Sequence, residues 1–234
     1  MTDVRAVLFD TYGTLVDWRT SVRDELAAFG RARGLVQDWD AFLADWKACY
    51  RVGMDAVNRG AVPWTPVETI YRRRLLELLA ARGIAASEDE IEYLTRAWWR
   101  LRPWPDTVPG LARLKRRHVI APLSNASFAG MVHLAKFAGL PWDCVITAEN
   151  ARCYKPRPEV YRTALDLLGV RPDEVLMTAA HNYDLAAAQA LGLRTAFVPR
   201  PLEHGPGQTT DLVAEGKWDV VVDSVDELAA ALGC

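Results

Sequence analysis

The chain has 234 residues and a formal net charge of −2, and half of its residues are hydrophobic. It can therefore bury a substantial core, and its charge gives no electrostatic reason to expect nucleic acid or a membrane surface as a partner. No stretch approaches the ~20 apolar residues that a membrane-spanning helix needs, and the N-terminus lacks the features of a signal peptide. The cysteines (Cys49, Cys144, Cys153 and Cys234) match no metal-binding spacing, so we expect reduced thiols and a cytoplasmic location.

A short apolar run at residues 5–9 predicts a buried strand that ends at Asp10. Between about residues 21 and 100, apolar residues recur at helical spacing, as at Val22, Leu26 and Phe29, which predicts about four helices. Beyond Pro105, short apolar strands alternate with helices. The helices are expected at 109–117, 128–138, 158–168, 183–190 and 225–232, and the strands within 118–125, 142–149, 174–180, 194–200 and 218–224.

This alternation is typical of βαβ units, in which helices cover both faces of a parallel sheet. The fold class is therefore predicted to be α/β, with a doubly wound, Rossmann-like parallel sheet as its core. Residues 1–16 and 103–234 would form that core, and residues 17–102 would form a helical domain inserted after the first strand. In such sheets ligands bind beyond the carboxyl ends of the strands, so the residues found there are the candidates for a site.

Polar side chains follow four successive strands of the predicted sheet. Each has an ordinary structural interpretation, such as an Asx-turn, a helix cap or a solvated charge. Their succession along one parallel sheet favours a shared site at its edge instead. In chain order these residues are Asp10, Ser124 with Asn125, Lys155, and His181 with Asp184.

With these residues, the sequence resembles the haloacid dehalogenase superfamily over essentially its whole length. That superfamily carries a nucleophilic Asp in a DxxGT motif, a Ser or Thr after a second strand, a Lys, and a terminal acidic motif. The matching residues are Asp10 with Gly13-Thr14, then Ser124, Lys155 and Asp184. The resemblance implies that residues 17–102 are a helical cap domain.

Tyr12 distinguishes between the two main activities of this superfamily. Its phosphatases resemble DxDGT, in which the second Asp protonates the leaving alcohol, and Tyr12 holds that position here. A phenol with a reference pKa near ~10 is a poor substitute for a carboxylate at neutral pH. A halide leaving group needs no proton, so Tyr12 favours dehalogenation. Asp184 is also the one acid of its motif, where metal-dependent members often carry two, so no metal or other cofactor is expected.

The local segments resemble those of (S)-2-haloacid dehalogenases. This resemblance implies hydrolysis of short 2-haloacids (haloacetates and 2-halopropionate) to 2-hydroxy acids through an ester on Asp10. Lys155 would keep Asp10 ionised, and Asp184, with His181, would orient and deprotonate the water. The small-molecule substrate and its halide would be bound by Thr11, Tyr12, Thr14, Ser124, Asn125, Lys47 and Tyr161, the last of which fits a packing role equally well.

The terminal motif departs from the family pattern SxNxxD, because Ala179 and His181 stand at the Ser and Asn positions. This leaves open whether His181 or Asp184 activates the water. The family's halide-binding arginine of the cap is matched by Lys47 or, one helical turn further on, by Arg51, so the halide ligand is open as well.

Two other functions remain alternatives at this point. One is a Mg²⁺-dependent small-molecule phosphatase of the same superfamily. The other is a relative that kept the fold without catalysis, which the departures at Ala179 and Lys47 motivate. A homodimer is also implied by the resemblance. His181 and the aromatic residues of the insert are compatible with a pocket for fluoride, so fluoroacetate is included among the expected substrates.

Overall fold

The computed structural model describes residues 4–234, and its centre is a six-stranded sheet in the order β5-β4-β1-β6-β7-β8. Each neighbouring pair of strands runs parallel. The first strand of the chain lies between β4 and β6, in the middle of the sheet, as a doubly wound core requires. The strands are β1 (Ala6–Phe9), β4 (Val119–Ser124), β5 (Ile146–Thr147), β6 (Val175–Ala179), β7 (Arg194–Phe197) and β8 (Val220–Val221).

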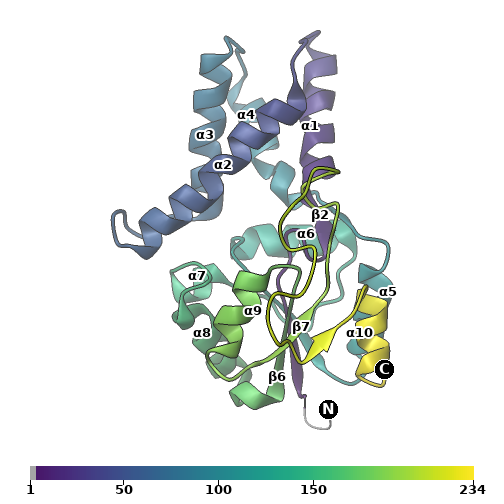
Figure 1. The fold of residues 1–234 in the computed structure, drawn as a ribbon. Coiled ribbons are helices and arrows are strands. Elements are labelled where there is room, and N and C mark those ends of the chain that lie inside the picture. Colours follow the sequence, from purple (N-terminus) through teal and green to yellow (C-terminus); the bar gives the residue numbers. More distant parts are fainter. Residues whose placement is uncertain (1–3) are drawn as a thin grey trace.

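Helices cover both faces of this sheet, and the side chains of β1 alternate between them. Val7 and Phe9 belong to a buried cluster that includes side chains of α5, α6 and α10. Ala6 and Leu8 belong to a second cluster, with side chains of α8 and α9. Figure 1 shows α8 and α9 on one side of the strands and α5 and α10 on the other, which confirms the predicted fold class. The helices of this part are α5 (Thr107–Leu114), α6 (Phe128–Ala138), α7 (Ala148–Ala151), α8 (Pro158–Leu168), α9 (Asn182–Gln189) and α10 (Val225–Ala231), with a 3₁₀ turn, η2 (Pro172–Glu174).

The segment between β1 and α5 is helical, as predicted, and Figure 1 shows its helices together beyond one end of the sheet. Its core is aromatic: Trp46, Tyr71 and Trp98 are fully buried, and the rings of Tyr71 and Trp98 stack with their centroids 4.1 Å apart. Two short antiparallel strands hold the ends of the segment side by side. The elements are β2 (Val16–Asp17), α1 (Trp18–Ala32), α2 (Trp39–Asn58), α3 (Val67–Ala81), α4 (Glu88–Thr95), the 3₁₀ turn η1 (Arg96–Trp99) and β3 (Arg102–Pro103).

Several elements differ in extent from the prediction, and three of them show the physical reason. The helix expected at 109–117 spans 107–114, because the charged residues 115–117 are exposed and bury no face against the sheet. The strand expected within 142–149 is only β5, after which Thr147 caps the single-turn helix α7. The strand expected within 218–224 is only β8. Both short strands lie at the edges of the sheet, where a strand pairs on one side only.

Residues 198–219 connect β7 to β8 without a helix or strand. Figure 1 shows this connection rising from the sheet toward the base of α1. There the Glu203 carboxylate accepts a hydrogen bond from Nε1 of Trp18 at 3.0 Å. Glu203 also lies beside Gly13, beyond β1, and His181, beyond β6, so the connection passes beside the carboxyl ends of both strands. Within residues 4–234, no helix combines the length and apolar character needed to cross a membrane.

Candidate active site

A cavity of about 590 Å³ lies between the carboxyl end of β1, helix α2 and the connection after β7. It is found where the parallel sheet was expected to present its chemistry. Of the residues predicted for the site, Asp10, Tyr12, Lys47, Lys155 and His181 line this cavity. The other lining residues include Tyr50, Arg51, Met54 and Asp55 from α2, Tyr183 from α9, and Glu203 and His204 from the connection.

Asp10 is fixed by bonds to both of its carboxylate oxygens. It is the first residue beyond β1, and its N–H donates to the carbonyl of Thr178 on β6 at 2.9 Å. Oδ1 accepts from Nζ of Lys155 at 2.9 Å, and Oδ2 accepts from Oγ1 of Thr14 at 2.7 Å and from Nδ1 of His181 at 3.1 Å. Burial opposes ionisation, but Lys155 and His181 outweigh it and hold the pKa of Asp10 well below its usual range. Asp10 is therefore an ionised carboxylate in the wall of the cavity.

Lys155 joins Asp10 to the second acid of the site, Asp184. Its ammonium bonds to both carboxylates, and the hydroxyl of Tyr161 donates to the other oxygen of Asp184. Burial lowers the pKa of Lys155, but the two carboxylates raise it overall. Burial and the nearby charge of Asp10 raise the pKa of Asp184, so Asp10 is the more acidic of the pair. Asp184 is fully buried and does not line the cavity.

His181 lies between two carboxylates. Its Nδ1 faces Asp10, and its Nε2 is 2.9 Å from Oε2 of Glu203. Burial lowers the pKa of His181, but Glu203 and Asp10 together raise it well above the ordinary value. The ring therefore carries a proton at neutral pH and donates from both nitrogens. Burial raises the pKa of Glu203, but His181 outweighs this and lowers it overall, so Glu203 is ionised.

Glu203 was not among the residues predicted from the sequence. It lies 22 residues after His181, on an irregular connection, and belongs to no motif. The sequence contains one indirect sign of Glu203, the glycine at position 13. Gly13 of the DxxGT motif has a φ of 91°, and a Cβ built there would lie 2.1 Å from Oε1 of Glu203. The turn after Asp10 thus leaves room for this carboxylate by omitting a side chain.

Tyr12 is hydrogen-bonded to the helical segment. Its hydroxyl donates to the carbonyl of Trp98 at 2.9 Å, and its ring stacks on that indole with centroids 6.4 Å apart. Burial raises the pKa of Tyr12 well above the ordinary value, so the phenol keeps its proton. The position that holds a second acid in the phosphatases of this superfamily is therefore occupied by a neutral side chain.

Lys47 is held among aromatic rings. Its Nζ lies 3.8 Å from the ring centroid of Tyr50, 4.8 Å from that of Trp18 and 5.2 Å from that of Trp98. Within residues 4–234, no carboxylate lies within ion-pair distance of it. Burial lowers the pKa of Lys47 to about 8. Arg51, one turn along α2, is exposed and lies over the ring of Tyr183 at 5.4 Å.

Thr14 and Tyr161 do not line the cavity. The hydroxyl of Thr14 donates to Asp10 and accepts from the N–H of Ala180 at 2.9 Å. The hydroxyl of Tyr161 donates a hydrogen bond to Oδ1 of Asp184. These bonds favour a role in positioning the two carboxylates over the direct substrate contact predicted from the sequence.

Asn125, Ser124 and Thr11 are buried beside the cavity as well. The carboxamide of Asn125 accepts from the N–H of Lys155 at 2.8 Å and donates to its carbonyl at 3.4 Å, which favours a positioning role for Asn125 as well. The hydroxyl of Ser124 accepts from the N–H of Ala126 at 3.2 Å. Oγ1 of Thr11 is buried without a hydrogen-bond partner in the described part of the chain.

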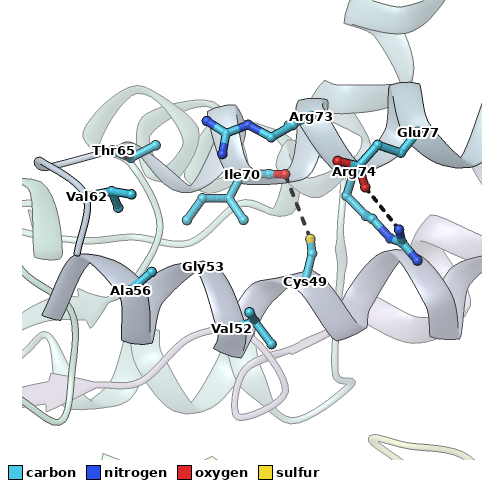
Figure 2. Close-up of a pocket in the computed structure, with 10 residues that line it drawn as sticks. All are labelled: Cys49, Val52, Gly53, Ala56, Val62, Thr65, Ile70, Arg73, Arg74 and Glu77. Atoms are coloured by element: carbon cyan, nitrogen blue, oxygen red, sulfur yellow. Dashed lines mark hydrogen bonds and ion pairs between the residues drawn. The ribbon is translucent and has the colours of Figure 1, made fainter. Parts of the chain in front are cut away.

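A second hollow, between α2 and α3, contains none of the predicted site residues (Figure 2). Its wall includes Val52 and Ile70, and the ion pair between Arg74 and Glu77 lies at one end. Burial raises the pKa of the Cys49 thiol there to about 11, so this thiol is not a nucleophile at neutral pH. Across residues 4–234, no group of three or more His, Cys, Asp or Glu side chains is arranged to hold a metal ion.

Comparison with protein families finds that a model described as haloacid dehalogenase-like hydrolase matches residues 4–192. The chain belongs to this family. The superfamily predicted from the DxxGT motif and the later strand ends is thus confirmed. Among curated haloacid dehalogenases, the (S)-2-haloacid dehalogenase of Xanthobacter autotrophicus is 32% identical over 204 residues, which cover 84% of this chain and 76% of that protein.

Solved structures of the family are similar over nearly the whole chain. One L-2-haloacid dehalogenase superposes with a TM-score of 0.96 at 44% identity, covering 98% of this chain and 99% of that one. A defluorinating L-2-haloacid dehalogenase also has a TM-score of 0.96 and 44% identity, covering 99% and 96%. The enzyme from Xanthobacter autotrophicus, with chloropropionic acid covalently bound, has a TM-score of 0.80 at 26% identity, covering 98% of each chain.

Proposed function

We propose that the protein is a hydrolytic dehalogenase that converts short 2-haloacids, such as haloacetates and 2-halopropionate, to 2-hydroxy acids. The observation that carries the proposal is an ionised, immobilised Asp10 in the cavity wall, followed two residues later by Tyr12 and not by a second acid. Relatives and solved structures matched over most of this chain are named as (S)- or L-2-haloacid dehalogenases, which supports the same reaction.

In the first step, the Asp10 carboxylate attacks the carbon that bears the halogen. Oδ1 is the attacking atom, because it accepts one hydrogen bond whereas Oδ2 accepts two. A carbon–oxygen bond forms, the carbon–halogen bond breaks, and its electron pair leaves with the halide. No proton is transferred in this step, so the neutral side chain of Tyr12 does not slow it. Lys155 keeps Asp10 ionised until it reacts.

In the second step, water attacks the carbonyl carbon of the Asp10 ester, and His181 accepts its proton. Esterification removes the charge of Asp10, which is one of the two carboxylates that raise the pKa of His181. The pKa of His181 then falls, its proton passes to solvent, and Nδ1 becomes a base facing the ester. Cleavage of the carbonyl carbon–oxygen bond expels the alkoxide, which takes the second proton of the attacking water. The products are the 2-hydroxy acid and the ionised Asp10 carboxylate.

We assign the base to His181 and a supporting role to Asp184. His181 lines the cavity, whereas Asp184 is fully buried and bonded to Lys155 and Tyr161. The role of Asp184 is then to hold Lys155 beside Asp10. This is the choice that we propose between the two residues left open by the sequence.

Lys47 is proposed as the ligand of the departing halide, in preference to Arg51. The ammonium group of Lys47 is surrounded by aromatic rings and has no carboxylate of the described residues at ion-pair distance. The more distant charges of Glu203 and Asp10 raise its pKa, which burial lowers. Arg51 lies further out, over Tyr183. The substrate carboxylate is proposed to contact the backbone N–H groups of residues 11 and 12, with Ser124 nearby.

Halide release from chloro-, bromo- and fluoroacetate and from each enantiomer of 2-chloropropionate tests the proposal. We expect release that EDTA does not affect and that an Asp10→Asn variant lacks. Absence of release above that variant would overturn the proposal, and EDTA-sensitive turnover of phosphate esters would favour a phosphatase instead. Repeated turnovers in H₂¹⁸O should place label in the Asp10 peptide, which a non-catalytic relative would never acquire. Fluoride release is included because a defluorinating family member is 44% identical.

Three expectations from the sequence remain proposals. Residues 17–102 are proposed as a cap domain on a core of residues 1–16 and 103–234, of which residues 1–3 lie outside the described residues. Limited proteolysis at the β2–β3 junction tests this division. A cytoplasmic location is tested by cell fractionation. A homodimer is tested by light scattering of the purified protein.

A further inference from the structure

Lys155 lies on a segment, residues 152–157, that belongs to neither a helix nor a strand. Its ammonium must nevertheless meet Asp10 and Asp184 at hydrogen-bond distance. Regular backbone bonds do not supply that precision here, so the side chains that bond to this segment have to supply it.

Two asparagine side chains hold consecutive residues of the segment. Asn125, beyond β4, bonds to both the N–H and the carbonyl of Lys155. Asn58, the last residue of α2, makes the same pair of bonds to Tyr154: its Oδ1 accepts from the N–H at 2.9 Å and its Nδ2 donates to the carbonyl at 3.0 Å. One asparagine therefore belongs to the sheet side of the cavity and the other to the helical segment.

The contact of Asn58 extends over a buried surface. Tyr154 is fully buried, and its hydroxyl donates to the carbonyl of Thr65 at 2.5 Å. Its ring packs against Trp64 with centroids 4.9 Å apart. The side chain of Arg157 donates to the carbonyl of Asn58 at 3.0 Å. Residues 58–65 thus contact residues on both sides of Lys155, namely Tyr154 and Arg157.

The same helix also forms one wall of the cavity. Lys47, Tyr50 and Arg51 of α2 line the cavity, and Asn58 ends the helix two turns later. A shift of α2 relative to the sheet would change the cavity wall and break both bonds to Tyr154 together. The position of Lys155 therefore depends on the position of α2 relative to the sheet.

We propose that Asn58 is a positioning residue, which places Lys155 against Asp10 when α2 is seated on the core. The proposal rests on the function proposed above, because Lys155 acts there by keeping Asp10 ionised and aligned. It adds a residue of the helical segment that touches no substrate and acts through the backbone of Tyr154.

The Asn58→Ala variant tests the proposal. Because a misplacement of about 1 Å at a reacting group costs on the order of 100-fold in rate, we expect single-turnover halide release to slow by roughly 10- to 100-fold. The KM should change by less than about threefold, because Asn58 does not line the cavity. Asn58→Asp keeps the acceptor for the N–H of Tyr154 and loses the donor, so its rate should be intermediate. Asn150→Ala is the matched control: it removes an exposed carboxamide that accepts from the N–H of Thr147 at 2.9 Å, and should leave the rate unchanged.

NMR-detected amide exchange provides a readout that does not depend on activity. In Asn58→Ala, the N–H groups of both Tyr154 and Lys155 should exchange faster, although Lys155 is bonded to Asn125 and not to Asn58. Faster exchange at Tyr154 alone, or a wild-type rate of halide release, would overturn the proposal. If the wild-type protein releases no halide, the proposed function fails, and the exchange at Lys155 still decides whether Asn58 positions it.

Discussion

Replacing Glu203 with Gln isolates the contribution of this carboxylate to the second step of the proposed reaction. Glutamine keeps the length of the side chain and an oxygen that accepts from Nε1 of Trp18. It removes the negative charge that lies 2.9 Å from Nε2 of His181. Because Glu203 raises the pKa of His181, that pKa falls in the variant. The imidazolium that forms when water loses its proton is then less stable.

The size of the effect follows from this one bond. A hydrogen bond to a charged group contributes about 1.5–3 kcal/mol, which corresponds to roughly 10- to 150-fold in the rate of ester hydrolysis. The first step transfers no proton to His181, so its rate should change little. The acid limb of the hydrolysis rate should move to lower pH, since a lower pKa leaves His181 neutral at more acidic pH.

Rapid-quench measurement of halide release separates the two steps. In Glu203→Gln we expect a burst of halide equal to the enzyme concentration, followed by slow turnover. Mass spectrometry of the quenched protein should find the ester on Asp10. Glu77→Gln, which removes an exposed carboxylate from the ion pair with Arg74, is the matched control and should show wild-type kinetics. Unchanged turnover in Glu203→Gln would refute the assignment of His181 as the base. A burst without an ester on Asp10 would refute Asp10 as the nucleophile.

Three further variants probe separate parts of the site. Inhibition by bromide should weaken as pH rises through about 8, where Lys47 loses its charge, and Lys47→Arg should abolish this pH dependence; identical profiles would exclude Lys47 as the halide ligand. Gly13→Ala should displace Glu203, because the added Cβ would lie 2.1 Å from Oε1, and should reproduce the halide burst. Tyr12→Phe loses the bond to the Trp98 carbonyl and should lower the free energy of unfolding by about 1 kcal/mol in denaturant titrations, with halide release near the wild-type rate.

The sequence by itself determined the α/β class, the helical insert and the order of the reactive strand ends. These features are local, because strands, helices and glycine caps each leave a pattern within a few residues. Asp10, Lys155 and His181 were predictable because parallel strands bring their carboxyl ends to one edge, and all three line the cavity. The prediction made the edge strands β5 and β8 too long, since apolar runs do not reveal how many neighbours a strand has.

Only the tertiary structure decided which groups surround those residues. Glu203 reaches His181 and Trp18, and Asn58 reaches Tyr154 across 96 positions of the chain. Hydrogen bonds between such distant segments leave no periodicity and no spacing in the sequence, because their geometry arises only when the helical segment packs on the sheet. The same packing turned Thr14 and Tyr161 toward the carboxylates and away from the cavity. The chain thus encodes its reactive residues locally, and their positions and pKa values through contacts that exist only in the folded state.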